Sequence, residues 1–353
     1  MKNKHEYLRV GITTGDLNGI GMEVIIKGLL DNRLLTTCTP IVYGSSKTAS
    51  FHRKALKIND FSFNIIQSAD EANPKKPNLI NCWNEDVEIN LGQPSATTGQ
   101  YALKSIEAAA KDLAEGRIDV IVTLPIDKKT IQGEGFNFPG HTEYFTQLSN
   151  EKESLMLLIA ENLRVGVVTG HIPLKEVAER LTKEQILQKL RIMNNSLLRD
   201  FGVVKPRIAV LGLNPHAGDN GLLGEEEKNI IIPAVEQGRR EGILCFGPYA
   251  SDGFFGSPAL GQFDGVLAMY HDQGLTPFKA LSFDAGVNFT AGLPIVRTSP
   301  DHGVAYDIAG KGEANENSFR QAVYSACDIF MQRKFYREIN ANKLQPQQKM
   351  ERE

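Results

Sequence analysis

Three of the chain's seven histidines follow directly on apolar runs that are typical of β-strands. His171 ends a Val-Val-Thr-Gly-His segment, His216 ends Val-Leu-Gly-Leu-Asn-Pro-His, and His271 ends Val-Leu-Ala-Met-Tyr-His. In open α/β sheets, ligands bind beyond the carboxyl ends of the strands, where loops and helix starts converge. Three imidazoles leaving strands at that edge could hold one divalent cation and keep positions open for water or substrate. Each histidine alone fits an ordinary turn, but the repeated context favours a metal site.

Two cations and one turn could bind an anion. Lys279 and Arg297 bracket a glycine-rich strand, and the planar guanidinium of Arg297 can hold a phosphate or carboxylate with two hydrogen bonds. A Pro-Gly-His-Thr-Glu-Tyr segment, which contains His141 and Thr142, predicts a turn into a helix whose free N–H groups suit the same ligands. Two alternatives stay open. The cations could be solvated surface residues, and Thr142 could simply cap the helix.

Short β-rich runs alternate with longer segments of helical period, which predicts an α/β architecture with a largely parallel sheet. The predicted strands span residues 8–14, 40–43, 118–124, 163–169, 207–212, 263–269 and 287–290. Apolar spacing between Leu103 and Leu113 predicts one helix, and the capping-box pattern of Thr182 and Gln185 predicts the start of another. The glycine-rich turn at residues 15–21 lacks the G-x-G-x-x-G order, so alone it indicates only a tight strand-to-helix connection.

Composition narrows the class of protein. Lys plus Arg number 39 and Asp plus Glu 42 among 353 residues, so the formal net charge is −3 and the basic surface typical of nucleic-acid binding is missing. No apolar stretch approaches the ~20 residues that cross a bilayer, and the charged start has no apolar segment behind it, unlike a secretory signal. Four scattered cysteines indicate free thiols in a reducing compartment. We therefore expect a cytoplasmic protein that binds a small molecule, with no nucleic-acid or membrane partner.

Five motifs together resemble the 4-hydroxythreonine-4-phosphate dehydrogenase family of vitamin B6 synthesis. They are Gly-Asp-Leu-Asn-Gly-Ile-Gly from Gly15, Pro-Gly-His-Thr-Glu from Pro139, Leu-Asn-Pro-His-Ala-Gly from Leu213, Met-Tyr-His-Asp-Gln-Gly from Met269 and Arg-Thr-Ser-Pro-Asp-His-Gly from Arg297. The likeness extends from about Val10 to Phe330 and keeps the order of the motifs. Leu17 and Met22 stand where the family usually has prolines, a change that affects loop stiffness but removes no chemical group.

The resemblance implies a fold similar to isocitrate and isopropylmalate dehydrogenases, with two α/β/α domains around a central cleft. Residues 1–130 with 276–335 would form a discontinuous domain that carries the dinucleotide loop. Residues 131–275 would form a second domain with the metal ligands and the dimer contacts, and residues 336–353 a polar tail.

The resemblance also assigns site residues. A divalent cation (zinc, magnesium or cobalt) would bind His171, His216 and His271 in a site shared between the subunits of a homodimer. The residues that match the family's substrate site are His141, Thr142, Lys279, Asn288 and Arg297. Those of the loop that would hold the dinucleotide are His302, Gly303, Asp307, Gly310 and Asn315. The carboxylate of Asp307 would favour NAD over NADP, because it can accept hydrogen bonds from ribose hydroxyls.

The implied activity is metal-dependent, NAD(P)-linked oxidation of 4-phosphooxy-L-threonine to 2-amino-3-oxo-4-phosphooxybutanoate. This β-keto acid would decarboxylate to 3-amino-2-oxopropyl phosphate on the route to pyridoxine and pyridoxal 5′-phosphate. Asp272, Lys128 and a metal-bound water are the candidate proton acceptors. The alternatives are a dehydrogenase of another phosphorylated hydroxy acid, such as erythronate or threonate 4-phosphate, a dehydrogenase of a cyclic dihydrodiol, and a metallohydrolase that needs no nucleotide.

Overall fold

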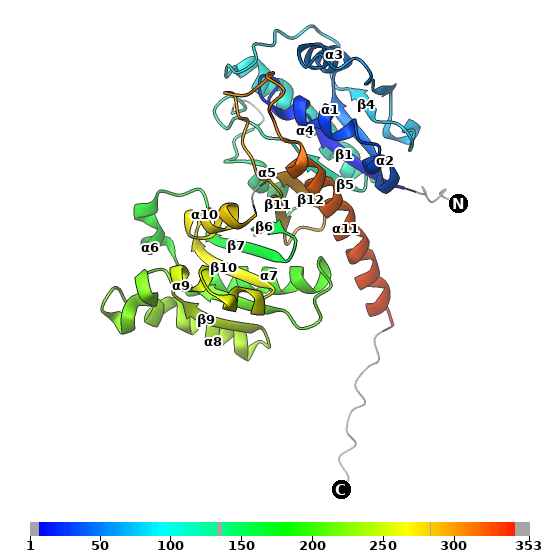
Figure 1. Ribbon diagram of the computed structural model, residues 1–353. Coiled ribbons are helices and arrows are strands. Elements are labelled where there is room, and N and C mark those ends of the chain that lie inside the picture. The colour runs from blue at the N-terminus through cyan, green and yellow to red at the C-terminus, as the bar shows by residue number, and fades with distance from the viewer. Residues whose placement is uncertain (1–6, 133–135, 283, 343–353) are drawn as a thin grey trace.

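The computed structural model describes residues 7–132, 136–282 and 284–342 and builds them around one mixed β-sheet (Figure 1). Within these residues the sheet has twelve strands in the order β3-β4-β2-β1-β5-β12-β11-β6-β7-β10-β8-β9. In chain order they are β1 (Leu8–Thr13), β2 (Cys38–Gly44), β3 (Asn64–Ile66), β4 (Asn78–Asn81), β5 (Val120–Thr123), β6 (Leu155–Ala160), β7 (Leu163–Thr169), β8 (Arg207–Leu211), β9 (Leu244–Tyr249), β10 (Gly265–Tyr270), β11 (Val287–Ala291) and β12 (Arg297–Pro300). Only the pairs β11–β12, β11–β6 and β6–β7 are antiparallel. The predicted α/β class with a largely parallel sheet is confirmed.

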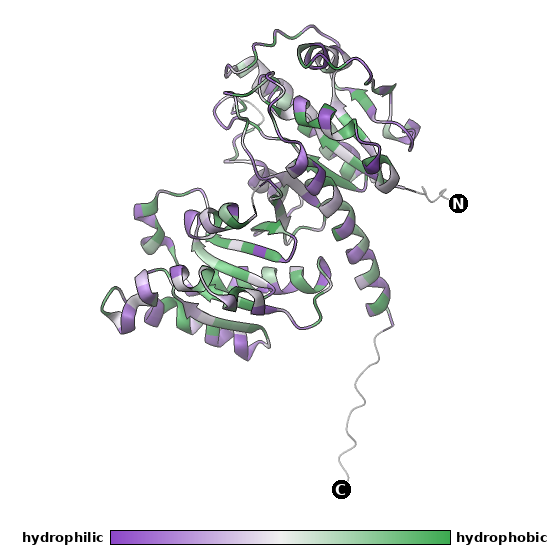
Figure 2. Ribbon diagram, in the orientation of Figure 1, coloured by the Kyte–Doolittle hydropathy of each residue, from purple (hydrophilic) through white to green (hydrophobic). Residues whose placement is uncertain are grey.

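Helices flank the sheet on both sides. Those of the described residues are α1 (Gly21–Leu29), α2 (Arg33–Thr37), α3 (Ser46–Ala55), α4 (Ala96–Ala114), α5 (His141–Leu148), α6 (Val177–Arg180), α7 (Lys183–Arg199), α8 (Ile232–Arg240), α9 (Ser251–Phe255), α10 (His271–Leu281) and α11 (Asn317–Asn340). In Figure 1 the blue and cyan part of the chain, with α1 to α4, lies above the green and yellow part, with α6 to α10. Figure 2 shows that apolar residues gather in the strands of both parts, whereas hydrophilic residues cover the outer helix faces.

The predicted elements form close to their expected bounds. All seven predicted strands are present, each within two residues of its predicted ends. The capping box before α7 also forms, because Thr182 Oγ1 accepts from the Gln185 N–H at 3.2 Å while Gln185 Oε1 accepts from the Thr182 N–H. Residues 336–340, predicted to begin a polar tail, continue α11 instead, and 343–353 lie outside the described residues. The division into domains at residues 130 and 275 stays a prediction, since one continuous sheet crosses both parts.

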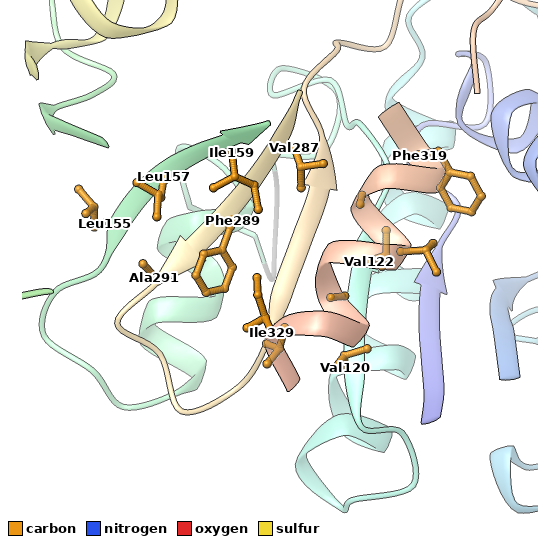
Figure 3. Packing of buried hydrophobic residues seen from close by; sticks show 14 of the residues in the cluster. Val120, Val122, Leu155, Leu157, Ile159, Val287, Phe289, Ala291, Phe319 and Ile329 are labelled. Atoms are coloured by element: carbon orange, nitrogen blue, oxygen red, sulfur yellow. The ribbon is translucent and has the colours of Figure 1, made fainter. Parts of the chain in front are cut away.

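Strands β11 and β12 join the two parts of the sheet. β12 runs parallel to β5 of the upper part, and β11 runs antiparallel to β6 of the lower part. Since Asn288 pairs with Ser299, cross-strand alternation puts Asn288, Thr290, Arg297 and Ser299 on one face. Residue Phe289 points to the other face, where α11 packs (Figure 3). One face of this strand pair is therefore polar, and the other belongs to the apolar core.

The glycine-rich turn after β1 connects several loops. Gly15 has a φ of +68°, and a Cβ there would lie 2.3 Å from the carbonyl oxygen of Pro125. The buried carboxylate of Asp16 accepts hydrogen bonds from the hydroxyls of Thr98, Thr130 and Tyr306, at 3.2, 3.2 and 3.0 Å. The turn is thus a junction of the fold, consistent with the tight connection that the sequence indicated.

In the described part of the chain, no helix combines the length and the apolar character that crossing a membrane requires. All four cysteines are free, as predicted.

Replacing Gly15 by Ala should destabilise the fold more than the same change at Gly116. Both glycines have a left-handed φ, +68° and +70°, but no atom lies within 4 Å of a Cβ at Gly116. Gly116→Ala should therefore show backbone strain alone, about 1 kcal/mol, and Gly15→Ala about 1–3 kcal/mol more from the steric clash. Urea unfolding of both variants measures the difference, and equal losses would contradict the role of the turn.

Candidate active site

A cavity of about 340 Å³ lies against the polar face of β11 and β12, and we call it the central cavity. Its volume suits a small ligand. All five residues predicted to bind substrate line it, namely His141, Thr142, Lys279, Asn288 and Arg297. So do five other predicted site residues, Lys128, His171, His271, His302 and Gly303. His216, Asp272, Asp307, Gly310 and Asn315 are not among the residues that line it.

Arg297 is a buried cation without a carboxylate partner. Its side chain is only 2% exposed, and its guanidinium donates to the hydroxyls of Thr123, at 2.6 and 3.0 Å, and Thr290, at 3.2 Å. Among the described residues no carboxylate oxygen lies within 4.0 Å of it. Burial lowers the pKa of Arg297 to about 9, an effect that the charge of Glu143 partly opposes, so the guanidinium is charged at neutral pH. A buried charge of this kind calls for an anion, which a bound substrate would supply.

Among the described residues, four further polar atoms of the central cavity are buried without a hydrogen-bond partner: His141 Nε2, Glu143 Oε2, Asn288 Oδ1 and His302 Nε2. Burial, followed by the positive charges of Arg297 and Lys128, holds the pKa of His141 well below its usual range, so this imidazole is neutral. Buried polar groups normally have partners, and here a bound ligand would provide them.

The anion site was weighed against two alternatives, a helix cap at Thr142 and solvated surface cations. Helix α5 begins at His141 with Gly140 as its N-cap, and no side chain caps it. The alternative that Thr142 caps the helix is therefore wrong, and its first N–H groups remain available to a ligand. Arg297 is not a solvated surface residue. Lys279, whose side chain is 53% exposed, donates to the carbonyl oxygen of Asp301 at 3.2 Å and lies 3.5 Å from its carboxylate.

Two of the three predicted metal ligands lie side by side. His171 follows β7 and His271 begins α10 directly after the neighbouring strand β10, and their ring centroids are 5.8 Å apart. His216 follows β8, the next strand along, but it does not join them. Among the described residues of one chain, no group of three histidine, cysteine or acidic side chains is placed to hold a metal ion.

His216 is exposed at the start of an unusual backbone segment. Five successive residues, from His216 to Asn220, have φ between +41° and +79°. The left-handed region costs about 1–2 kcal/mol for each residue other than glycine, and such strain is typical of functional sites. The buried carboxylate of Glu227 anchors the segment, because one oxygen accepts from the N–H groups of Leu213 and Asn214, at 2.7 and 2.8 Å. The fold therefore holds His216 in a fixed, outward position.

The predicted dinucleotide loop lies beside a second hollow of about 330 Å³. Lys279, Asp301 and His302 line both this hollow and the central cavity, so the two are adjacent. Asn315 lines the hollow, while Asp307 is exposed and does not. The buried carboxylate of Glu23 shapes the loop, because it accepts from the N–H groups of Gly310 and Ala314, both at 3.1 Å.

The two predicted proton acceptors have different surroundings. Lys128 lines the central cavity. The side chain of Asp272 is 81% exposed, and its carboxylate lies 2.7 Å from Nδ1 of His271. This geometry favours Lys128 as the acceptor.

Sequence reasoning missed several residues of the site. Glu143 lines the central cavity with its carboxylate 3.6 Å from Nδ1 of His171, and Thr123 holds Arg297. Asp301 pairs with Lys279. Glu143 and Asp301 both stand in motifs quoted for the resemblance, which was the available signal, whereas nothing in the sequence marks Thr123.

Comparison with known proteins gives a consistent set of relatives. The chain matches the family model of pyridoxal phosphate biosynthetic protein PdxA over residues 36–326. It is 54% identical over 341 residues to 4-hydroxythreonine-4-phosphate dehydrogenase of Bacteroides thetaiotaomicron. The aligned residues make up 96% of this chain and 93% of that protein. It is 39% identical over 333 residues to D-threonate 4-phosphate dehydrogenase of Cupriavidus necator, covering 93% and 99%. The crystal structure of 4-hydroxythreonine-4-phosphate dehydrogenase from Klebsiella pneumoniae aligns with a TM-score of 0.80 and 36% identity, over 93% of this chain and 99% of that one.

Replacing Arg297 by Met should leave the free energy of unfolding unchanged or raise it, while binding of inorganic phosphate is lost. The reason is that the change removes a buried charge that has no carboxylate partner. Arg333 is a matched control, since it is also buried but donates to Asp200 at 2.7 Å. Arg333→Met should lower the free energy of unfolding by about 3 kcal/mol. This value is at the low end of the range for a broken buried ion pair, because Arg199 still contacts Asp200 in the variant. Urea unfolding and calorimetric phosphate titration test this, and similar destabilisation by both changes would contradict it.

Proposed function

The chain belongs to the family of pyridoxal phosphate biosynthetic protein PdxA and is an oxidoreductase, and we propose that it oxidises 4-phosphooxy-L-threonine with a nicotinamide cofactor. The product is 2-amino-3-oxo-4-phosphooxybutanoate, a β-keto acid that loses carbon dioxide to give 3-amino-2-oxopropyl phosphate. One observation carries the proposal. A buried guanidinium without a carboxylate partner among the described residues shares its cavity with four unpartnered polar atoms and with two adjacent histidines.

The substrate's negative groups suit the charges of the central cavity. Arg297 and Lys279 bind the anionic groups, and the neutral imidazole of His141 with the N–H groups at the start of α5 completes their hydrogen bonds. Asn288 Oδ1, which has no partner in the protein, accepts from a hydroxyl or ammonium of the substrate. Together these contacts would orient the reacting carbon within the cavity.

The histidines fit a divalent cation, because neutral imidazole nitrogens are ligands for zinc, cobalt and related ions, and magnesium stays a further candidate. His171 and His271 supply two ligands from one chain, and His216 of the partner subunit supplies the third in a homodimer. This arrangement accounts for a strained, exposed His216 that lies away from the other two.

The cation and the nicotinamide would supply part of the chemistry, and residues of the protein supply the rest. A divalent cation would supply Lewis-acid polarisation of the reacting hydroxyl, and a nicotinamide would accept the hydride. In its neutral amine form Lys128, which lines the central cavity, would take the proton of that hydroxyl and become an ammonium, and Asp272 is the second candidate for this role. The reducing equivalents leave as the reduced nicotinamide.

The second hollow and the loop that contains His302, Gly303, Asp307, Gly310 and Asn315 hold the dinucleotide. Apolar side chains of Ile20, Ala305 and Ile308 line this hollow beside Asn315, a mixture that suits adenosine. NAD is the expected cofactor, since Asp307 offers a carboxylate to the ribose hydroxyls and would repel the additional phosphate of NADP.

Turnover of a substrate panel tests the proposal. We expect reduction of NAD with 4-phosphooxy-L-threonine in the presence of a divalent cation, measured as NADH absorbance, with release of carbon dioxide. D-Threonate 4-phosphate is the control substrate, because a relative of 39% identity carries that name. Faster NADH formation with D-threonate 4-phosphate would replace the proposed substrate. Release of phosphate without NADH would indicate a metallohydrolase instead.

Mixing two inactive variants tests whether the metal site is shared between subunits. His171→Ala and His216→Ala should each abolish activity, because each removes one metal ligand from every site. In a homodimer with shared sites, unfolding and refolding the two variants together creates mixed dimers with one complete site. Random mixing should then restore about a quarter of the wild-type activity. If the mixture stays inactive although mixed dimers form, His216 does not act across the interface.

A further inference from the structure

His171 and His271, the two predicted metal ligands in the central cavity, each have a carboxylate beside the same ring nitrogen. Nδ1 of His271 lies 2.7 Å from Asp272 Oδ1, and Nδ1 of His171 lies 3.6 Å from Glu143 Oε1. The two carboxylates come from different elements, since Glu143 is in α5 and Asp272 follows His271 in α10. Independent elements therefore place the same chemical group at the same position on both rings.

A carboxylate beside Nδ1 selects one form of a neutral imidazole. The single ring proton then sits on Nδ1, where it donates to the carboxylate, and Nε2 keeps its lone pair. The hydrogen bond also fixes the orientation of the ring and increases the electron density available to a metal. At His271 this hydrogen bond is present and leaves only Nε2 for a cation, whereas the 3.6 Å separation at His171 is that of an ion pair and has to shorten slightly for Glu143 to accept the proton.

We propose that Glu143 and Asp272 are positioning residues that hold His171 and His271 as Nδ1–H tautomers, so that both rings present Nε2 to the divalent cation. This inference rests on the proposed metal-dependent function and deepens it. It also gives Asp272 a role through His271 in place of the role of proton acceptor.

Glu143 is the better shielded of the two carboxylates, although its contact is the longer one. Its side chain is 38% exposed, against 81% for Asp272, so water competes less effectively for the Glu143 contact. Glu143 also lies in the wall between two cavities, since it lines both the central cavity and a neighbouring hollow of about 720 Å³ that His171 shares. The position of this one carboxylate therefore fixes the ring of His171 relative to the substrate.

Metal affinity of the full-length protein tests the role of Glu143. Metal-free protein is titrated with Co²⁺ against a chromophoric chelator. Glu143→Ala should weaken Co²⁺ binding 10- to 100-fold, the range found when such supporting groups are lost. Glu143→Gln should weaken it less, because its amide oxygen can still accept from Nδ1–H. Glu151→Ala is the matched control, because Glu151 is an exposed acid of the same neighbouring hollow without a contact to His171.

The tautomer itself provides a readout that needs neither metal nor substrate. In ¹⁵N-histidine-labelled, metal-free protein, two-bond nitrogen–proton correlations should show His171 and His271 as Nδ1–H forms, and Glu143→Ala should shift His171 alone toward Nε2–H. Wild-type His171 protonated on Nε2, or Glu143→Ala with unchanged Co²⁺ affinity, would overturn the inference. Failure of the proposed substrate to react would leave both readouts intact, so the two failures are distinguishable.

Discussion

The antiparallel pairing of β11 with β12 in the middle of the sheet is the constraint on which the rest of the structure depends. This pair stands between the parallel strands of the two parts and joins them into one sheet, which contains eight parallel strand pairs. It also sets Asn288 opposite Ser299. Alternation along the two strands then gives Arg297 and Asn288 to the cavity, and Phe289 to the core beneath α11. A slip of one residue would exchange the faces and bury the wrong side chains. The apolar packing on one face of this strand pair therefore determines which polar side chains the other face presents to the cavity.

The site departs from the rules that stabilise the rest of the chain. Arg297 is buried with hydroxyls as its protein partners, several cavity atoms lack hydrogen bonds, and the segment from His216 to Asn220 is left-handed. Arg333 shows the ordinary arrangement, since its buried guanidinium contacts Asp200 and two backbone carbonyls. Departures of this kind concentrate where a ligand or a second subunit supplies what the single chain lacks.

Seven of the twelve strands in the described residues were predicted from the sequence, because they consist largely of apolar, β-branched residues, as is typical of strands buried on both faces. The prediction missed β3, β4, β6, β9 and β12. The apolar run of β6 carried the same signal and was overlooked. The Arg-Thr-Ser-Pro sequence of β12 carries no such signal and forms a strand because β5 and β11 lie on either side. The substrate residues could be found through their motifs. Thr123 and the carboxylate contact of Glu143 could not, since they depend on how distant segments meet. The separation of His216 from its two companions is likewise a property of the folded chain, although their similar local contexts suggested one cluster.

Asp16 ties together two segments beside the central cavity and the second hollow. Its carboxylate contacts Thr130, two residues from Lys128, and Tyr306, in the loop proposed to hold the dinucleotide. Tyr306 also donates to Asp127 at 3.3 Å, so the two segments share a second contact. The segment of the proposed proton acceptor and the loop proposed to hold the adenosine are thus joined by shared hydrogen bonds. Loss of the Asp16 carboxylate would therefore remove contacts to both segments at once.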